Sequence, residues 1–452
     1  MINSYINSEA FILYYMKIIL LLFVLVLLAK GDNINLNLED TGLASGNGYI
    51  VDDNSITISG SGEYTLSGTS SRAFIISGTP VTLNFNHIQL STRGAPPITI
   101  KKNCELTINI ITNNVLIDNK DNEKDGVIYM ESGSKLVFTA DSEENSLYFS
   151  PFKKFGIYGE ESTNLVMNNR ANIILNSEEE TGFIKIDKDI IINDGNLGDD
   201  NDVSDKYPSL QAGGSITIKK GKFSMHSIKA EGKIYLGEEN ANQNENEDED
   251  EDSLGIYIKT LNTGIEANEI TVYSGKITIF SEKDSFSSKG DIIIRGRYFL
   301  IETGSSETKS SPFKKVGKLA VENAWIQAYG TNCIGGVIDN KQLSFSYFEE
   351  IKKNSKLSFY LGNDIVSENT LDKDFSYMYS SLPFPSSYGN LELKIDGNKV
   401  SSFDEGTCSS NIDSGSDSDS DTYSDSDSKS NSNYLNLVNS YFIHFLVYLI
   451  LF

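Results

Sequence analysis

Residues 263–279, TGIEANEITVYSGKITI, and residues 284–301, DSFSSKGDIIIRGRYFLI, are two versions of one phrase. Each begins with a short polar turn and continues with apolar residues that alternate with polar ones. Alternation with a period of two is typical of strands with one buried face, and the glycine inside each phrase marks a turn between two such strands. The apolar positions recur 21 or 22 residues apart, so each phrase is one coil of a repeat.

Similar coil starts recur along the chain, at residues 125–127, 181–183, 208–210 and 226–228. A near-duplicate pair, SPFKKFG at 150–156 and SPFKKVG at 311–317, also has this form. One interval is too long, because 37 residues separate His226 from Thr263. Removing residues 238–253 shortens it to 21 residues. We therefore predict that this acidic segment is a disordered loop inserted at one corner of a coil.

Stacked coils bury a continuous apolar interior that a single coil cannot bury alone. The repeat therefore predicts an all-β fold, a right-handed parallel β-helix, or solenoid, with rungs from about residue 56 to residue 360. Residues 32–55 would form an N-terminal cap, and a hairpin near residues 391–395 would belong to the C-terminal cap. The competing fold, an antiparallel sandwich, needs short hairpin turns and would not repeat side-chain positions at this spacing.

Both ends of the chain resemble targeting signals. Met16 and Lys17 precede an apolar run, so we expect residues 1–31 to be a signal peptide, with translation starting at Met1 or at Met16. After the β-helix domain, residues 32–402, a Ser/Asp-rich stalk at 403–433 leads into an apolar tail at 434–452. The tail has the pattern of a glycolipid (GPI) anchor signal, and a single-pass helix is the alternative. We expect a secreted, cell-surface monomer that contacts the membrane only through this anchor.

The formal charge of −25 is concentrated in two segments. Residues 238–252 contain nine acidic side chains, and residues 413–427 contain six. Such runs are solvated spacers, and the rest of the chain is only mildly acidic. Nucleic acid is therefore excluded as a partner. The three cysteines predict no disulfide framework, and the three histidines assemble neither a zinc site nor a catalytic triad.

Three features carry a resemblance to a known family: ITISGSGEYTLSGT at residues 56–69, VTLNFNHIQLS at 81–91, and the repeated coil starts. They resemble the carbohydrate-binding domain-containing proteins of the pectate-lyase-like β-helix superfamily, over about residues 56–302. The resemblance implies non-catalytic binding of plant cell-wall polysaccharide, cellulose- or pectin-like, with calcium at the coil turns. The family's Asp-Gly-Ile turn keeps its aspartate at Asp125 and Asp284 but loses it at Thr181, Thr263 and Pro208.

An outward row of side chains is the predicted polysaccharide site. Aligning the last regular coils by their apolar ladder places Lys276, Tyr298 and Trp325 in one outward column, with Tyr329 further along the strand of Trp325. Coils stack about 4.8 Å apart, which is comparable to one sugar of a β-linked chain. The alternative is that the aromatic residues of the C-terminal segment cover this column.

Calcium requires several converging oxygen ligands. The candidate metal ligands are Asp284 with Asp291, and Asp125 with Asp118 and Asp121. The alternative for each cluster is a solvated turn without an ion, because aspartate is common in turns.

Two other functions remain open at the level of sequence. A calcium-dependent polysaccharide lyase would need a basic residue beside a metal-bound carboxylate, and Arg295 and Arg297 lie on the coil of Asp284 and Asp291. A surface adhesion protein without a glycan ligand would use the solenoid only as a spacer.

Overall fold

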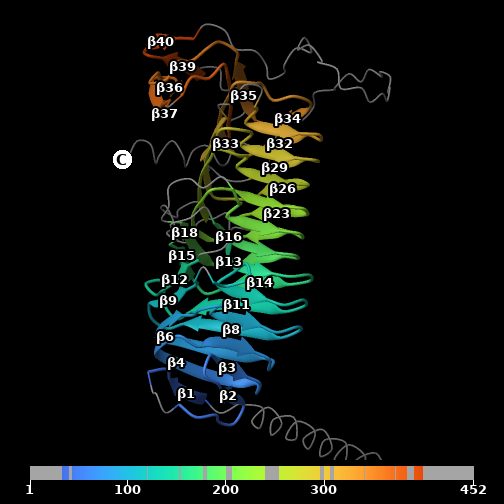
Figure 1. Ribbon diagram of the computed structural model, residues 1–452. Coiled ribbons are helices and arrows are strands. Elements are labelled where there is room, and N and C mark those ends of the chain that lie inside the picture. The colour runs from blue at the N-terminus through green and yellow to red at the C-terminus, as the bar shows by residue number, and fades with distance from the viewer. Residues whose placement is uncertain are drawn as a thin grey trace, which may run out of the picture. The chain divides into compact units, whose positions relative to one another are not determined.

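The computed structural model describes residues 33–39, 43–119, 121–151, 154–176, 181–199, 206–239, 254–295, 300–305, 310–340, 342–371, 373–383 and 391–400 (Figure 1). The chain divides into two units, Met1–Cys408 and Ser409–Phe452, and all described residues belong to the first. The predicted signal peptide, stalk and anchor lie outside the described residues, as does most of the predicted acidic loop. In the part of the chain that the structure describes, no helix is long and apolar enough to cross a membrane.

The described chain forms a parallel β-helix, which confirms the predicted fold class (Figure 1). Each regular coil contributes one strand to each of three faces, and between β7 and β33 each strand of such a coil pairs in parallel with the strand three places later in the chain. A 12-stranded sheet makes the first face, and a 24-stranded sheet supplies the second and third faces.

The strands of the first face are β2 (Tyr49–Val51), β3 (Ser55–Ile58), β5 (Ala73–Ile76), β7 (Ile98–Ile100), β10 (Ile128–Met130), β13 (Phe155–Gly159), β16 (Gly182–Ile186), β19 (Leu210–Ala212), β22 (Ile228–Ala230), β25 (Ile265–Ala267), β28 (Phe286–Ser288) and β31 (Phe313–Lys315). Those of the second face are β8 (Glu105–Ile110), β11 (Lys135–Ala140), β14 (Asn164–Met167), β17 (Ile190–Ile192), β20 (Ile216–Ile218), β23 (Lys233–Leu236), β26 (Glu269–Val272), β29 (Ile292–Arg295), β32 (Leu319–Glu322) and β34 (Ile338–Asn340).

The third face contains β9 (Asn114–Ile117), β12 (Ser146–Ser150), β15 (Ala171–Leu175), β18 (Gly195–Asp199), β21 (Gly221–Met225), β24 (Leu254–Thr260), β27 (Lys276–Ser281), β30 (Leu300–Ser305) and β33 (Trp325–Gly330). Near the N-terminus, β1 (Asn33–Asn37), β4 (Gly62–Ser70) and β6 (Val81–Ser91) join the same 24-stranded sheet. β6 is long enough to pair with both β8 and β9, so the second and third faces are still one continuous strand there.

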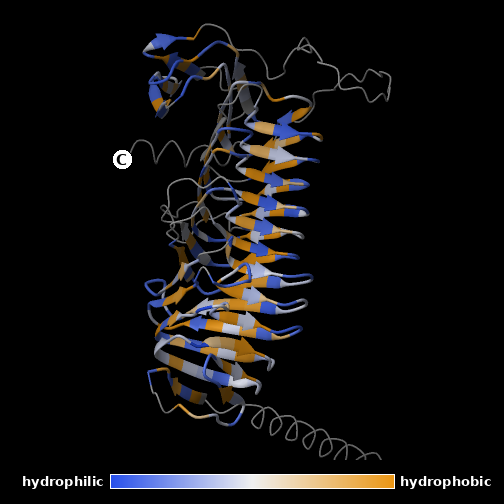
Figure 2. Ribbon diagram, viewed as in Figure 1, coloured by the Kyte–Doolittle hydropathy of each residue, from blue (hydrophilic) through white to orange (hydrophobic). Residues whose placement is uncertain are grey.

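The interior is a set of apolar ladders that run from coil to coil. On the first face Ile228, Ile265 and Phe286 lie one above the other, and each is almost fully buried. Polar or mixed residues occupy the alternate, outward positions, so orange and blue alternate along the strands in Figure 2. Burying one aliphatic side chain contributes about 1.5–3 kcal/mol. The ladders therefore hold the stack together.

Coil length varies more than the sequence predicts. Ile265 pairs with Phe286, 21 residues later, as expected, but Ile128 pairs with Ile157, 29 residues later. The near-duplicate phrases also differ in register. Phe313, inside the second copy, is the inward residue that stacks on Phe286, whereas Ile157, the corresponding inward residue, follows the first copy. Turn length is free to vary because turns face solvent, and only the inward positions must coincide.

The acidic insertion lies where it was predicted, between β23 and β24. Tyr235 pairs with Thr217 on one side and Thr271 on the other, so the second-face ladder is unbroken before the insertion. Tyr257 pairs with Ser224 and Thr278 in the same way after it. The insertion therefore leaves the register of the coil intact.

The two ends depart from the parallel pattern. β1 already pairs in parallel with β4, so a rung begins within the predicted N-terminal cap, while β2 pairs antiparallel with β3. At the other end the last parallel pair is β32 with β34, which ends at Asn340, about twenty residues before the predicted end of the rungs. β38 (Tyr377–Leu382) then lies antiparallel between β33 and β35 (Leu343–Tyr347).

A separate four-stranded antiparallel sheet follows, made of β37 (Asp364–Thr370), β36 (Lys356–Leu361), β39 (Leu391–Ile395) and β40 (Asn398–Lys399). The β39–β40 hairpin is the terminal hairpin expected from the sequence. Cys333 is disulfide-bonded, whereas Cys104 is a buried free thiol. The cysteine spacing gave no indication of this bond.

Polar contacts between neighbouring coils supplement the apolar ladders. Lys135 and Glu105 are register partners joined at 2.9 Å, and Lys233 and Glu269 are joined at 3.0 Å. These pairs are exposed, so each contributes little to the free energy of unfolding. Because like charges at the same positions would repel, the pairs favour one register.

Deleting residues 240–253 should leave the fold and its stability nearly unchanged. Gly237, Glu238 and Glu239 would then join β23 to β24, and three residues also join β26 to β27. The free energy of unfolding should change by less than about 1 kcal/mol, because loop length alone has a weak effect. Urea unfolding followed by circular dichroism measures it, and a loss above about 3 kcal/mol would show that the insertion belongs to the core.

Glu160 should make stability depend on pH. Its carboxylate accepts hydrogen bonds from the phenol of Tyr129 and, at 3.3 Å, from the hydroxyl of Ser132. The Tyr129 hydrogen bond is the main cause that lowers the pKa of Glu160 below its usual 4.5. The added stability is therefore complete above pH 4.5 and is lost as the pH falls through the lower, folded-state pKa. The difference in Tm between the wild type and Glu160→Gln should shrink over that range, and a constant difference would contradict this.

Candidate functional site

The structure corrects the alignment behind the predicted outward column. Ile277 pairs with Ile301, not with Phe299, because the corner before β30 is two residues longer than the corner before β27. Leu300 pairs with Trp325, so the column contains a leucine where a tyrosine was expected. Tyr298 itself lies outside the described residues.

Two other members of the predicted site are covered by the C-terminal strands. Tyr329 is buried, its ring centroid is 5.5 Å from that of Phe375, and its hydroxyl donates to Gln327 at 3.1 Å. Trp325 is half-buried and packs against the same C-terminal cluster, with its indole Nε1 shielded from solvent. Of the alternatives left open by the sequence, the structure favours coverage by the C-terminal segment at these two positions.

Lys276 is exposed at the start of β27, and its surroundings differ from those expected. Further along β24 and β27 lie Tyr257 and the half-buried Phe280, whose ring centroids are 6.1 Å apart. The Tyr257 side chain is 44% exposed. Tyr257 follows the acidic insertion, which hides its position in the repeat, so the sequence alignment missed it.

The predicted calcium ligands are used to join neighbouring coils. One oxygen of Asp284 accepts the backbone N–H of Ser311 at 2.9 Å, and the other lies 3.3 Å from the ammonium group of Lys314. Asp291 accepts the backbone N–H of Lys318 at 2.9 Å.

The other cluster has the same character. Asp125 forms an ion pair with Lys154 at 3.1 Å, and Asp118 accepts a hydrogen bond from Asn122 at 2.9 Å. Asp121 lies exposed in the same turn. Among the described residues no three His, Cys, Asp or Glu side chains converge on one point, so these carboxylates do not fit a calcium site.

The second face has a surface hollow among the described residues. It lies over β29, β32 and β34 and has a cavity volume of about 80 Å³. Its floor is formed by Ile293 and Ala320, which are register partners, and Asp339 follows Ala320 in the same outward column. Ala320 has only a methyl group at a position where the neighbouring coil below has an isoleucine, and this missing volume creates the hollow. We call it the Ala320 groove.

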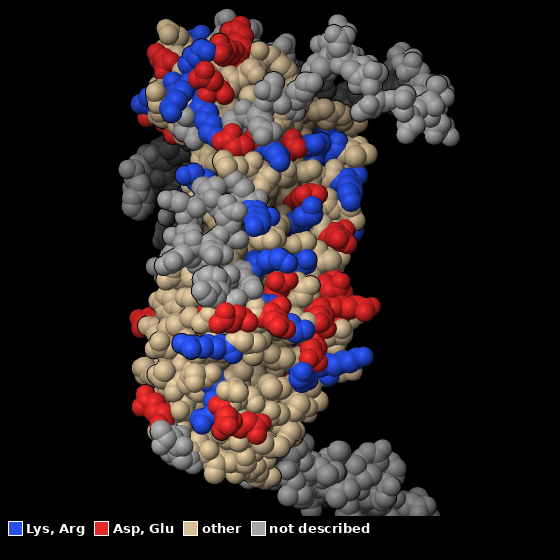
Figure 3. All heavy atoms as spheres, in the orientation of Figure 1, with Lys and Arg blue, Asp and Glu red and all other residues tan. Residues whose placement is uncertain are grey.

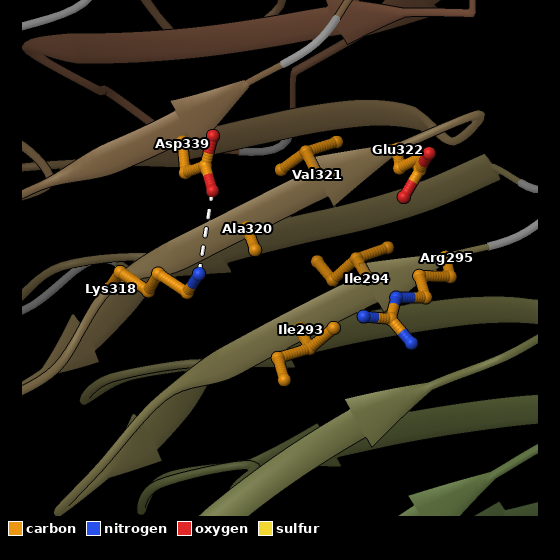
Figure 4. A pocket seen from close by; sticks show the side chains of 8 residues that line it. All are labelled: Ile293, Ile294, Arg295, Lys318, Ala320, Val321, Glu322 and Asp339. Atoms are coloured by element: carbon orange, nitrogen blue, oxygen red, sulfur yellow. Dashed lines mark hydrogen bonds and ion pairs between the residues drawn. The ribbon is translucent and has the colours of Figure 1, made fainter.

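Charged side chains stand at both ends of the Ala320 groove (Figure 4). Lys318 and Asp339 lie at one end and are joined by an ion pair of 3.4 Å. Arg295 and Glu322, which are register partners, lie at the other end. Basic and acidic side chains are mixed over this part of the surface (Figure 3). The groove therefore offers both hydrogen-bond donors and acceptors on either side of an apolar floor.

Two tyrosines extend this surface along the stack. Tyr235 and Tyr273 stack with their ring centroids 6.3 Å apart and their planes 10° apart. Burial and the nearby carboxylate of Glu239 raise the pKa of Tyr273, whereas Arg295 opposes this rise. Tyr273 directly follows Val272, whose register partner is Ile294, so Tyr273 lies at the same corner of the coil stack as Arg295. Of these residues the sequence singled out Arg295 alone, because a single outward alanine leaves no signal in an apolar repeat.

Tyr329→Ala and Lys276→Ala should separate a covered position from an exposed one. Removing the buried Tyr329 ring should lower the free energy of unfolding by about 3 kcal/mol, because it leaves a cavity against Phe375. Lys276→Ala should change it by less than about 0.5 kcal/mol. Urea midpoints of both variants measure the difference. Equal midpoints would mean that the C-terminal strands do not cover Tyr329 in solution.

Comparison with protein families identifies a match that agrees with the resemblance found in the sequence. A family model described as carbohydrate-binding domain-containing protein matches residues 52–308. The comparisons with curated proteins and with solved structures gave no match. Since the matched segment spans more than half of the chain and runs from the first face at β3 into the third face at β30, the protein belongs to the carbohydrate-binding domain-containing protein family.

Proposed function

We propose that the Ala320 groove binds a polysaccharide of the plant cell-wall type, cellulose- or pectin-like, without cleaving it. The observation that carries this proposal is the combination of an apolar floor with charged groups at both ends, on a member of the carbohydrate-binding domain-containing protein family. Sugars need both kinds of contact, because a pyranose ring has apolar C–H faces and a rim of hydroxyl groups. Ile293 and Ala320 provide the apolar contact.

The polar groups match the hydroxyl rim. The carboxylates of Glu322 and Asp339 accept hydrogen bonds from hydroxyl groups, and the side chains of Arg295 and Lys318 donate to hydroxyl oxygens. Because the ends of the groove carry one basic and one acidic group each, it is suited to neutral sugars as well as charged ones. Charged partners strengthen such hydrogen bonds.

The direction of the coil stack supports binding of a chain rather than of a single sugar. Coils repeat about every 4.8 Å, which is comparable to the length of one sugar in an extended polysaccharide. A chain that lies along the second face would pass from the groove to Tyr273 and Tyr235. There it would meet ring edges and phenol hydroxyl groups, because the stacked rings turn their faces toward each other.

The absence of cleavage and the place of action are parts of the same proposal. At one end of the groove Lys318 is paired with Asp339, which ties up a basic group that a lyase would use to remove a proton. The targeting signals of the sequence support display at the cell surface. There a non-catalytic polysaccharide-binding protein would attach the cell to plant material.

Ala320→Trp should abolish binding by filling the groove, without disturbing the core. Thr217→Trp is the matched control, because Thr217 occupies the same outward column four coils earlier. In pull-down assays of the full chain with insoluble cellulose and xylan, A320W should lose at least about tenfold in affinity, which is about 1.4 kcal/mol. T217W should bind within about twofold of the wild type.

Three outcomes would contradict the proposal. Equal binding by A320W and the wild type would exclude the Ala320 groove. If the wild type binds none of the polysaccharides, the proposed function is excluded and an adhesion role is favoured. Release of unsaturated sugars from pectin by the wild type would show that the protein is a lyase.

A further inference from the structure

A cluster of four aromatic rings lies on the first face, away from the face that carries the Ala320 groove. Tyr129 and Tyr158 stack with centroids 5.9 Å apart and planes 8° apart. Phe155 lies 6.0 Å from Tyr158 and 5.2 Å from Tyr207, measured between centroids. We call these four residues the first-face aromatic cluster. Tyr129 and Phe155 are buried, whereas Tyr158 and Tyr207 are half-exposed, so the cluster has a fixed base and an accessible rim.

The register of the first face explains why the cluster forms. Tyr129, Tyr158 and Lys185 occupy the same outward position on three successive coils, each flanked by residues of the apolar ladder. Gln211 and Lys229 continue this column on the next two coils. The column therefore changes from aromatic to polar at Lys185.

Lys185 is the unusual member of this column. Its ammonium group lies 5.6 Å from the ring centroids of both Phe155 and Tyr158. The nearby Lys154 is 3.1 Å from Asp125, and Lys229 is 3.1 Å from Glu266. In contrast, Lys185 has no carboxylate within ion-pair distance in the parts of the chain that are described.

Contact with aromatic rings holds a cation in place without neutralising it. The three N–H donors of Lys185 therefore remain able to bind an anion, and a ring of Tyr158 lies beside them. Gln211, one coil further on, adds an amide at about 4.8 Å along the stack. A ligand that matches this arrangement has a carboxylate group attached to a body with an apolar face.

We propose that the first-face aromatic cluster and Lys185 form a second carbohydrate-binding site, which takes carboxylated sugars such as the uronate units of an acidic polysaccharide. The carboxylate binds the ammonium group of Lys185, and the sugar ring lies against the exposed rim of Tyr158 and Tyr207. This inference rests on the proposed function only in assuming that the protein binds carbohydrate. It does not require the Ala320 groove.

The test compares an acidic oligosaccharide with a neutral one, using the full chain. Lys185→Met keeps the apolar stem of the side chain against the rings and removes the charge. The affinity for oligogalacturonate, measured by calorimetry at low salt, should fall at least fivefold, whereas the affinity for a cello-oligosaccharide should not change. Lys229→Met is the matched control, because it occupies the same column but is paired with Glu266. It should keep wild-type affinity for both ligands.

The A320W variant separates this proposal from the one above. A320W should retain Lys185-dependent binding of oligogalacturonate even when it loses binding to other polysaccharides. Equal losses in K185M and K229M would show a general charge effect and overturn the proposal. The same conclusion follows if K185M weakens the neutral and the acidic ligand alike, or if the wild type does not bind oligogalacturonate.

Discussion

The structure depends on the vertical stacking of inward apolar side chains between coils. A single coil has an apolar surface but no second layer to cover it, so each coil is stable only against its neighbours. On the first face, for example, Ile265 is covered by Ile228 below and Phe286 above. This constraint acts on every second residue of each strand. It leaves outward residues and turns free to vary, and both proposed sites are built from those residues.

The same constraint explains which features the sequence predicts. Apolar alternation and the spacing of inward residues are sufficient to predict the parallel coils and the place of the acidic insertion. Turn lengths carry no such pattern. The corner before β30 is two residues longer than its neighbour, and this difference moved the predicted column from Leu300 to Tyr298. A two-residue shift in the alignment keeps the same alternation of inward and outward side chains. The apolar alternation therefore could not reveal this error.

The binding surfaces are harder to predict because they depend on neighbours that are distant in sequence. The Ala320 groove results from one small outward residue next to larger ones on adjoining coils. Tyr329 looks like an outward aromatic residue in its strand, but Phe375 from the C-terminal segment covers it. Lys185 is distinguished from Lys229 only by the missing carboxylate on the next coil. Single-residue patterns contain none of this information.

The antiparallel strands at the two ends have a consequence for solubility. A stack of parallel coils exposes, at each end, a row of unpaired backbone N–H and C=O groups, and such an edge can template the addition of further strands, as in amyloid fibrils. In this protein β2 pairs antiparallel with β3, and β38 pairs antiparallel with β33. A second molecule would have to displace these strands before its own coils could continue the stack. The end strands therefore hinder end-to-end polymerisation through the first face at the N-terminal end and through the third face at the C-terminal end.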